Sequence, residues 1–155
     1  MSYMQRIAIP STDGELTVVR LLRHYCGTRD DDDGDGTALS RLVALGQTLR
    51  LPPAGTVALV SVFQLTEAVL GRLLVTECCC SQSLSADERA VIRLLGSRMP
   101  SASGTGTVDI PHGLPGALAW AVLSVGWLCG GIIALPSHPV PGDDAGCPFA
   151  HRIAA

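Results

Sequence analysis

Three consecutive cysteines, Cys78, Cys79 and Cys80, form the most unusual reactive group in the sequence. Thiolate sulfur is both a zinc ligand and the nucleophile of thiol–disulfide exchange, so the run indicates a zinc site or a redox-sensing thiol site. Consecutive side chains point about 100° apart on a helix and to opposite faces of an extended segment, so three in a row do not converge easily on one ion. A zinc site would therefore need distant partners, such as Cys26 or His112. Because buried cysteine is an ordinary small apolar residue, we expect the three thiols to pack as small apolar side chains, with the zinc or redox role as the alternative.

The aspartate-rich segment 30–36 begins like a calcium-binding loop. The residues that match the EF-hand pattern are Asp31, Asp33, Asp35 and Gly36. The twelfth position of that pattern requires a bidentate glutamate, but it is Leu42 here, and Leu39 offers no side-chain ligand at the ninth. We therefore expect a solvated, self-repelling loop between two helices rather than a calcium site.

The remaining candidate motifs are incomplete. Cys147 and His151 have the separation of a metal-binding pair, but they stand alone in a proline-flanked tail. The segment 101–107 has glycines without the lysine of a phosphate-binding loop. No serine has a Gly-x-Ser-x-Gly context. The sequence therefore assigns no catalytic residue and favours a protein that is not an enzyme.

The composition fits one globular domain and limits the classes of partner. The chain has 155 residues, of which 47% are apolar and 16% charged, and this balance favours a helical globule or a membrane-attached protein over a disordered chain. Its eleven basic residues are all arginines and are scattered, so no basic stripe predicts binding of nucleic acid. No apolar segment follows the charge near the N-terminus, so we expect no cleaved secretory signal. We therefore expect the protein in the cytoplasm or, alternatively, at the inner membrane. In either place we expect its cysteines to be reduced.

Hydrophobic periodicity predicts the helices that would position these residues. The first, over 15–26, has the apolar stripe Val18, Leu21, Leu22 and Tyr25. The second and third are expected over 38–49 and 56–75, although the valines of the third also suit a short strand. Ser85 and Glu88 fit a capping box, in which each residue bonds the other's backbone amide, and this predicts the start of a fourth helix.

The segment 113–137 carries no charged residue, and Pro115 fits the first position of a last helix that we expect to end near Leu135. One interpretation is a membrane span over residues 114–135, because the apolar length suffices to cross a bilayer. The other is a central core helix surrounded by the remaining four. Both tryptophans of the segment lie inside it rather than at its two ends, which is poor placement for interfacial anchors.

These elements predict an all-α fold, an irregular bundle of about five helices with the apolar C-terminal helix at its centre. Short connections between the helices make sequential neighbours antiparallel. We expect one helical domain over residues 1–136 and a poorly ordered, proline-rich tail over residues 137–155.

The run from Arg72 to Cys80, followed by the run from Leu84 to Arg89, resembles a small helical family of uncharacterised alphaproteobacterial proteins. In that family a triple cysteine stands just ahead of a Thr/Ser-Ala-Asp-Glu helix start. The segment 112–118 is similar to the opening of the family's last helix, and the likeness covers about half of the chain. The resemblance implies a soluble helical domain and implies no activity, substrate or cofactor. The charge-free last helix departs from what such a domain would have.

Three functional hypotheses follow. The first is a non-catalytic interaction protein whose apolar faces bind a protein partner or a second copy of the chain, with no cofactor. The second is a redox or zinc-binding protein that uses Cys78, Cys79 and Cys80, with zinc as the cofactor of the metal-binding form. The third is attachment to the inner membrane through the last helix.

Overall fold

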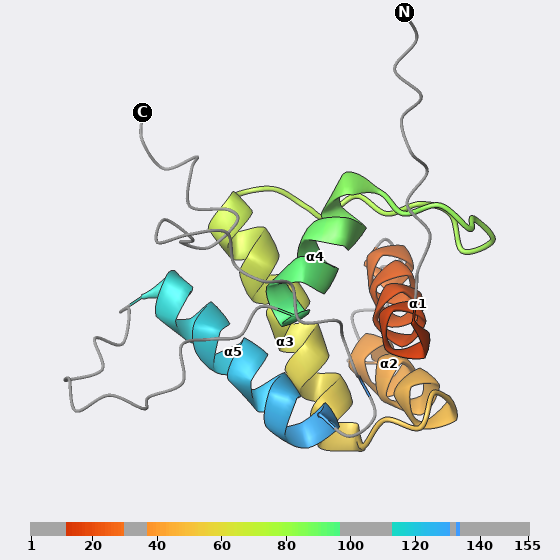
Figure 1. The fold of residues 1–155 in the computed structure, drawn as a ribbon, viewed down its shortest axis with the longest axis horizontal. Coiled ribbons are helices and arrows are strands. Elements are labelled where there is room, and N and C mark those ends of the chain that lie inside the picture. The colour runs from red at the N-terminus through yellow and green to blue at the C-terminus, as the bar shows by residue number, and fades with distance from the viewer. Residues whose placement is uncertain (1–11, 30–36, 97–112, 131–132, 134–155) are drawn as a thin grey trace, which may run out of the picture.

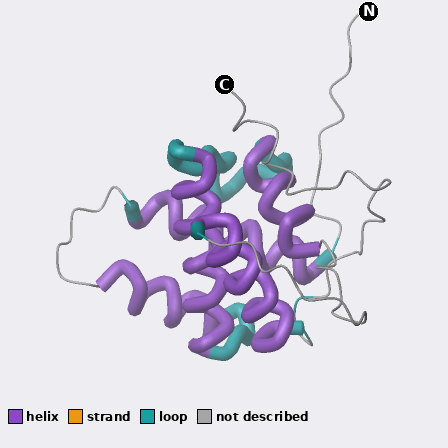
Figure 2. The backbone as a smooth tube through the Cα atoms, turned by 90° about the vertical axis from the view of Figure 1, so that its left-hand side faces the viewer, coloured by secondary structure: helices purple, strands orange, loops and turns teal. Residues whose placement is uncertain are grey.

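The computed structural model describes residues 12–29, 37–96, 113–130 and 133, and within these ranges it contains helices and no strand. The helices are α1 (Asp13–Thr28), α2 (Thr37–Thr48), α3 (Pro53–Leu70), α4 (Ala86–Gly96) and α5 (Leu114–Cys129). The predicted all-α class is confirmed, as Figure 2 also shows. The predictions made for the aspartate run 30–36, for His112, for the Cys147 and His151 pair and for the tail 137–155 lie outside the described residues.

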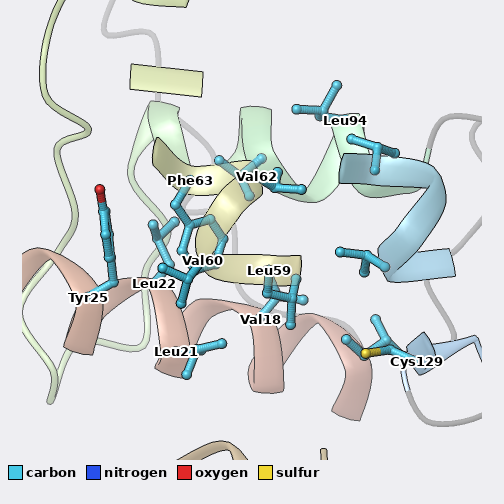
Figure 3. Close-up of a cluster of buried hydrophobic side chains, with 14 of the residues drawn as sticks. Val18, Leu21, Leu22, Tyr25, Leu59, Val60, Val62, Phe63, Leu94 and Cys129 are labelled. Carbon is cyan, nitrogen blue, oxygen red and sulfur yellow. The ribbon is translucent and has the colours of Figure 1, made fainter. Parts of the chain in front are cut away.

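α3 lies in the middle of the bundle, with α5 on one side and α1 and α2 on the other (Figure 1). α4 contacts both α1 and α5. The core contains buried apolar residues of all five helices, and Figure 3 shows side chains of α1 and α3 interdigitating within it. Tyr25 and Phe63 cross this interface with ring centroids 5.5 Å apart, a distance typical of favourable aromatic pairs. The residues of the predicted stripe, Val18, Leu21, Leu22 and Tyr25, are all buried, and Val19 and Cys26 are buried beside them.

The expected central position of the last helix has to be corrected, because α3 occupies it. The buried apolar residues of α5 form one narrow stripe at helical spacing, Leu118, Val122, Val125 and Cys129. The opposite side of α5 exposes Trp120 at 49% and Trp127 at 79%. α3 instead buries residues around nearly half of its circumference, so it can contact neighbours on two sides. Absence of charge therefore did not decide which helix is central.

The predicted helix ends need correction at α3 and α5. α3 stops at Leu70 rather than Val75, because Gly71 takes the left-handed conformation with φ of 65° and ends the helix. α5 stops at Cys129, before the expected end near Leu135, and of the residues after Gly130 only Ile133 is described.

α3 is also the described helix whose length and mean hydropathy, 1.4, would suffice to cross a membrane. In this structure 44% of α3 is buried inside the bundle, and a core helix passes the same test of length and composition. α5 is apolar but has only 16 residues. Membrane attachment through residues 114–135 stays a prediction.

Candidate functional site

The connection between α3 and α4, residues 71–85, contains the three consecutive cysteines. We call it the cysteine connection. Three arginine–carboxylate pairs surround it, and each pair also bonds the backbone of the connection: Arg23–Glu88, Arg29–Glu67 and Arg72–Asp87. These charges come from α1, α3 and α4 and from the connection itself, so the connection is held to the body of the bundle from several directions.

Arg23 of α1 spans the largest part of the connection. Its Nε donates to Glu88 Oε1 at 2.6 Å, and Glu88 raises the pKa of the Arg23 guanidinium through this bond. The two terminal nitrogens donate to three carbonyls, Cys78 O at 3.0 Å, Ser81 O at 2.7 Å and Ser83 O at 2.7 Å. The side chains of Arg23 and Glu88 are 9% and 0% exposed. One guanidinium therefore fixes the backbone at the first of the three cysteines and just after the last.

Glu88 also completes the predicted capping box at the start of α4, which the structure confirms. Ser85 N donates to Glu88 Oε2 at 2.7 Å, and Glu88 N donates to Ser85 Oγ at 3.0 Å. The same carboxylate thus caps α4 and neutralises Arg23. The start of α4 and the position of the cysteine connection are therefore linked through one side chain.

Arg72 and Asp87 form a bidentate pair at the exit from α3, with N–O distances of 2.7 and 2.8 Å. Asp87 Oδ2 also accepts from Val75 N at 2.8 Å, and Ser85 Oγ donates to Val75 O at 2.7 Å. Hydrogen bonding to Arg72 holds the pKa of the Asp87 carboxyl below its ordinary value of 3.8. Both backbone groups of Val75 are therefore satisfied by side chains.

Glu67 binds the backbone of Leu74, the residue before Val75. Its carboxylate accepts from Leu74 N at 2.8 Å and from the Tyr25 hydroxyl at 2.7 Å, and it pairs with Arg29. Arg29 in turn donates to Leu74 O at 3.1 Å. Burial, reinforced by the hydrogen bond to Glu67, raises the pKa of the Tyr25 hydroxyl.

The backbone at the cysteines forms a turn in which Ser81 N donates to Cys78 O at 3.0 Å. Cys78 and Cys80, two residues apart, turn toward the same side, and their sulfur atoms lie 2.9 Å apart. All three cysteines are exposed free thiols, so the expectation that they pack as small apolar side chains is wrong. The hydrogen bond from Cys80 lowers the pKa of the Cys78 thiol, and the same contact raises the pKa of Cys80. Of the two thiols, Cys78 is therefore the one that loses its proton first.

The predicted three-cysteine zinc site is only partly assembled. The structure brings Cys78 and Cys80 into contact but not Cys79, and among the described residues no group of three or more metal-binding side chains gathers. Cys26, one of the two suggested distant partners, is buried and donates to Leu74 O at 3.8 Å, and burial raises the pKa of its thiol. Zinc at these cysteines stays a prediction.

Sequence reasoning missed Arg23, which is not part of the predicted apolar stripe of the first helix. A signal was present, because Arg23 lies four residues after Val19 and three before Cys26, both of which are buried. An arginine at the border of an apolar stripe can reach across a neighbouring segment with its long side chain. The identity of its partner, 65 residues away, needed the fold.

Comparisons with protein-family models, with curated proteins and with solved structures found no match to this chain. The resemblance to an alphaproteobacterial family therefore stays a prediction.

Proposed function

We propose that this protein is a dithiol redox protein in which Cys78 and Cys80 alternate between two thiols and one disulfide. One observation carries the proposal: two exposed sulfur atoms lie 2.9 Å apart on a backbone that three ion pairs hold in place. Because the two sulfur atoms are already in contact, a disulfide can form between them without displacement of a helix. The loss of conformational freedom that closing a ring would otherwise require has already occurred in the reduced protein.

The chemistry is thiol–disulfide exchange with a small disulfide. The Cys78 thiolate attacks one sulfur of that disulfide, forms a mixed disulfide and releases the other half as a thiolate. Cys80 then loses its proton and attacks the Cys78 sulfur, which releases the second half. Two protein thiols and one disulfide become one protein disulfide and two small thiols, so atoms and electrons balance. The lowered pKa of Cys78 favours it as the attacking sulfur at neutral pH.

The test is to equilibrate the reduced protein with redox buffers of graded potential and then block the remaining thiols. Cleavage after Arg72 and Arg89 releases a peptide that contains all three cysteines of the connection, and its mass reports loss of two hydrogens. We expect the internal disulfide to form in the wild type and in Cys79→Ser, and to be absent from Cys78→Ser and Cys80→Ser. Formation of the disulfide in Cys80→Ser, or its failure to form in Cys79→Ser, would overturn the assignment.

A metal measurement separates this proposal from the zinc alternative. Protein purified without chelator is analysed for zinc, and its thiols are titrated before and after chelator is added. We expect no change in the number of reactive thiols. Stoichiometric zinc that protects Cys78 and Cys80 until chelator is added would replace the redox proposal with a metal site.

A second candidate function is self-association through the outer face of α5. Trp120 and Trp127 lie seven residues apart on this face, and Trp127 is 79% exposed. An apolar face without charges can pair with its own copy about a two-fold axis, because no like charges are brought together. A second copy of the chain is therefore the partner we propose for it.

Analytical ultracentrifugation over a range of concentrations tests this association. We expect the wild type to dimerise and Trp127→Glu to stay monomeric, because the new charge would be buried in the contact. Gln64→Glu is the matched control, since Gln64 is exposed on α3 and should leave the dimer unchanged. A wild type that is monomeric throughout, or that binds lipid vesicles through Trp127 instead, would contradict self-association.

A further inference from the structure

A hollow of about 450 Å³ lies beside the cysteine connection, between the second half of α1 and α2. Its lining includes Arg20, Arg23, His24, Arg41 and Leu45, together with Cys79, the residue between the two paired thiols. Three arginines and a histidine thus face one small space, and among the described residues no aspartate or glutamate lines it. We call it the basic hollow.

The basic hollow stands out because the chain as a whole has a net charge of −3. Within the hollow, the charge of Arg23 is matched by Glu88, whereas Arg20 and His24 are exposed. A concave surface lined by charges of one sign raises the local concentration of oppositely charged small molecules. Arg20 and His24 are therefore the groups available to a ligand that carries negative charge.

A neighbouring hollow differs from the basic hollow because an acidic residue contributes to its lining. It has a volume of about 430 Å³, lies on the other side of Cys79 and also includes Arg20, but Asp13 contributes to its lining. The two spaces meet at Arg20, Arg23 and Cys79. Among the described residues, a carboxylate thus lines the hollow beside Asp13 but not the hollow on the side of α2.

We infer that the basic hollow binds the carboxylate groups of a small anionic disulfide and that this molecule is the exchange partner of the Cys78–Cys80 dithiol. The inference rests on the proposed redox function and adds the class of its substrate. The hollow has the volume of a small-molecule site. Arginine pairs with carboxylates through two parallel hydrogen bonds, and a histidine beside it can donate one more. Seated there, the ligand lies against the residue that separates the two reacting thiols.

The test compares three disulfides that differ in charge: glutathione disulfide, which is anionic, hydroxyethyl disulfide, which is neutral, and cystamine, which is cationic. The rate of Cys78–Cys80 disulfide formation is measured at low ionic strength, and each rate is divided by the rate of the same disulfide with dithiothreitol. We expect glutathione disulfide to be favoured. We also expect Arg20→Gln and His24→Gln each to lower its normalised rate about threefold or more, and added salt to reduce the difference.

Arg93→Gln is the matched control, because Arg93 is an exposed arginine of α4 that lines neither hollow. We expect it to change the glutathione disulfide rate by less than about 1.5-fold, which reflects only the overall loss of charge. The rates with hydroxyethyl disulfide should be equal in all variants. Circular dichroism confirms that each variant is folded.

The outcomes separate the two proposals. If hydroxyethyl disulfide oxidises the pair while the three charge classes react alike, or if Arg20→Gln behaves like Arg93→Gln, the substrate class is wrong and the redox function stands. If no disulfide produces the Cys78–Cys80 bond, the redox function itself is wrong and the inference is lost with it.

Discussion

The ion pair between Arg23 and Glu88 is almost removed from solvent, with side chains 9% and 0% exposed. Burial of two charges costs solvation energy that their attraction only partly returns, so such a pair is not by itself a source of stability. Here the two side chains also make four hydrogen bonds to backbone groups of the cysteine connection. We conclude that the pair serves to define a conformation, and that losing one member is far more harmful than losing both.

Arg23→Leu should destabilise the protein by about 3–5 kcal/mol, because it leaves the Glu88 carboxylate buried without its partner. Urea denaturation measures this loss. Adding Glu88→Gln should restore part of the stability, since glutamine is neutral and can still close the capping box. Arg93→Leu, which changes an exposed arginine, should remain within about 0.5 kcal/mol of the wild type. A double variant less stable than Arg23→Leu would contradict the argument.

Asp87 predicts a dependence of stability on pH. Its folded pKa is lowered by Arg72, so its contribution is fully present above the ordinary value of 3.8 and is lost as the pH falls through the folded pKa. Asp87→Asn should therefore be less stable than the wild type at pH 7, and the difference should shrink below pH 3.8. Urea midpoints measured for both proteins between neutral and acid pH check this, and a constant difference would rule it out.

At the scale of the elements, Gly71 and Gly27 allow two properties of glycine to be tested apart: its tolerance of the left-handed conformation and its low helix propensity. Gly71 ends α3 with φ of 65°, and Gly27 lies inside α1; an added Cβ would meet no atom within 4 Å at either position. Gly71 directs the chain out of α3 into the cysteine connection, so the site depends on where this helix stops.

Gly71→Ala should destabilise the protein by about 1 kcal/mol, because alanine is disfavoured in the left-handed conformation. Gly27→Ala should stabilise it by about 0.5–1 kcal/mol, because alanine has the higher helix propensity. Thermal or urea denaturation measures both changes. We expect the two substitutions to change the free energy of unfolding in opposite directions. Two changes of the same sign would contradict this explanation.

At the scale of the whole molecule, small residues on α3 let both neighbouring helices approach closely. A Cβ added at Gly55 would lie 2.3 Å from Cys129 Sγ of α5, and one added at Gly46 of α2 would lie 2.0 Å from Thr56 Oγ1 of α3. Contacts this short cannot exist, so each glycine sets the separation of a helix pair. The central position of α3 depends on these contacts on both of its sides.

Gly55→Ala should destabilise the protein by about 1–3 kcal/mol, because it overpacks the contact between α3 and α5. Cys129→Ala removes the sulfur that the new methyl group meets, so the double variant should be more stable than the sum of the single effects predicts. Denaturant midpoints of the four proteins measure this coupling. Strict additivity would mean that α5 does not lie against Gly55 as described.

The sequence by itself determined the elements whose information is local. The apolar stripe of α1, the capping box of α4 and the all-α class follow from spacing along the chain, because helix formation and capping involve residues three or four positions apart. The same reasoning singled out Cys78, Cys79 and Cys80 as candidate reactive groups, since thiol chemistry belongs to the residue type.

Only the tertiary structure decided how those thiols are arranged and which helix is central. Pairing of Cys78 with Cys80 depends on a turn that Arg23 holds from 55 or more residues away, and α3 rather than α5 became central through close contacts at glycines on different helices. The physical reason is that these contacts join residues distant in sequence, and no local pattern records which arginine will meet which carboxylate or carbonyl.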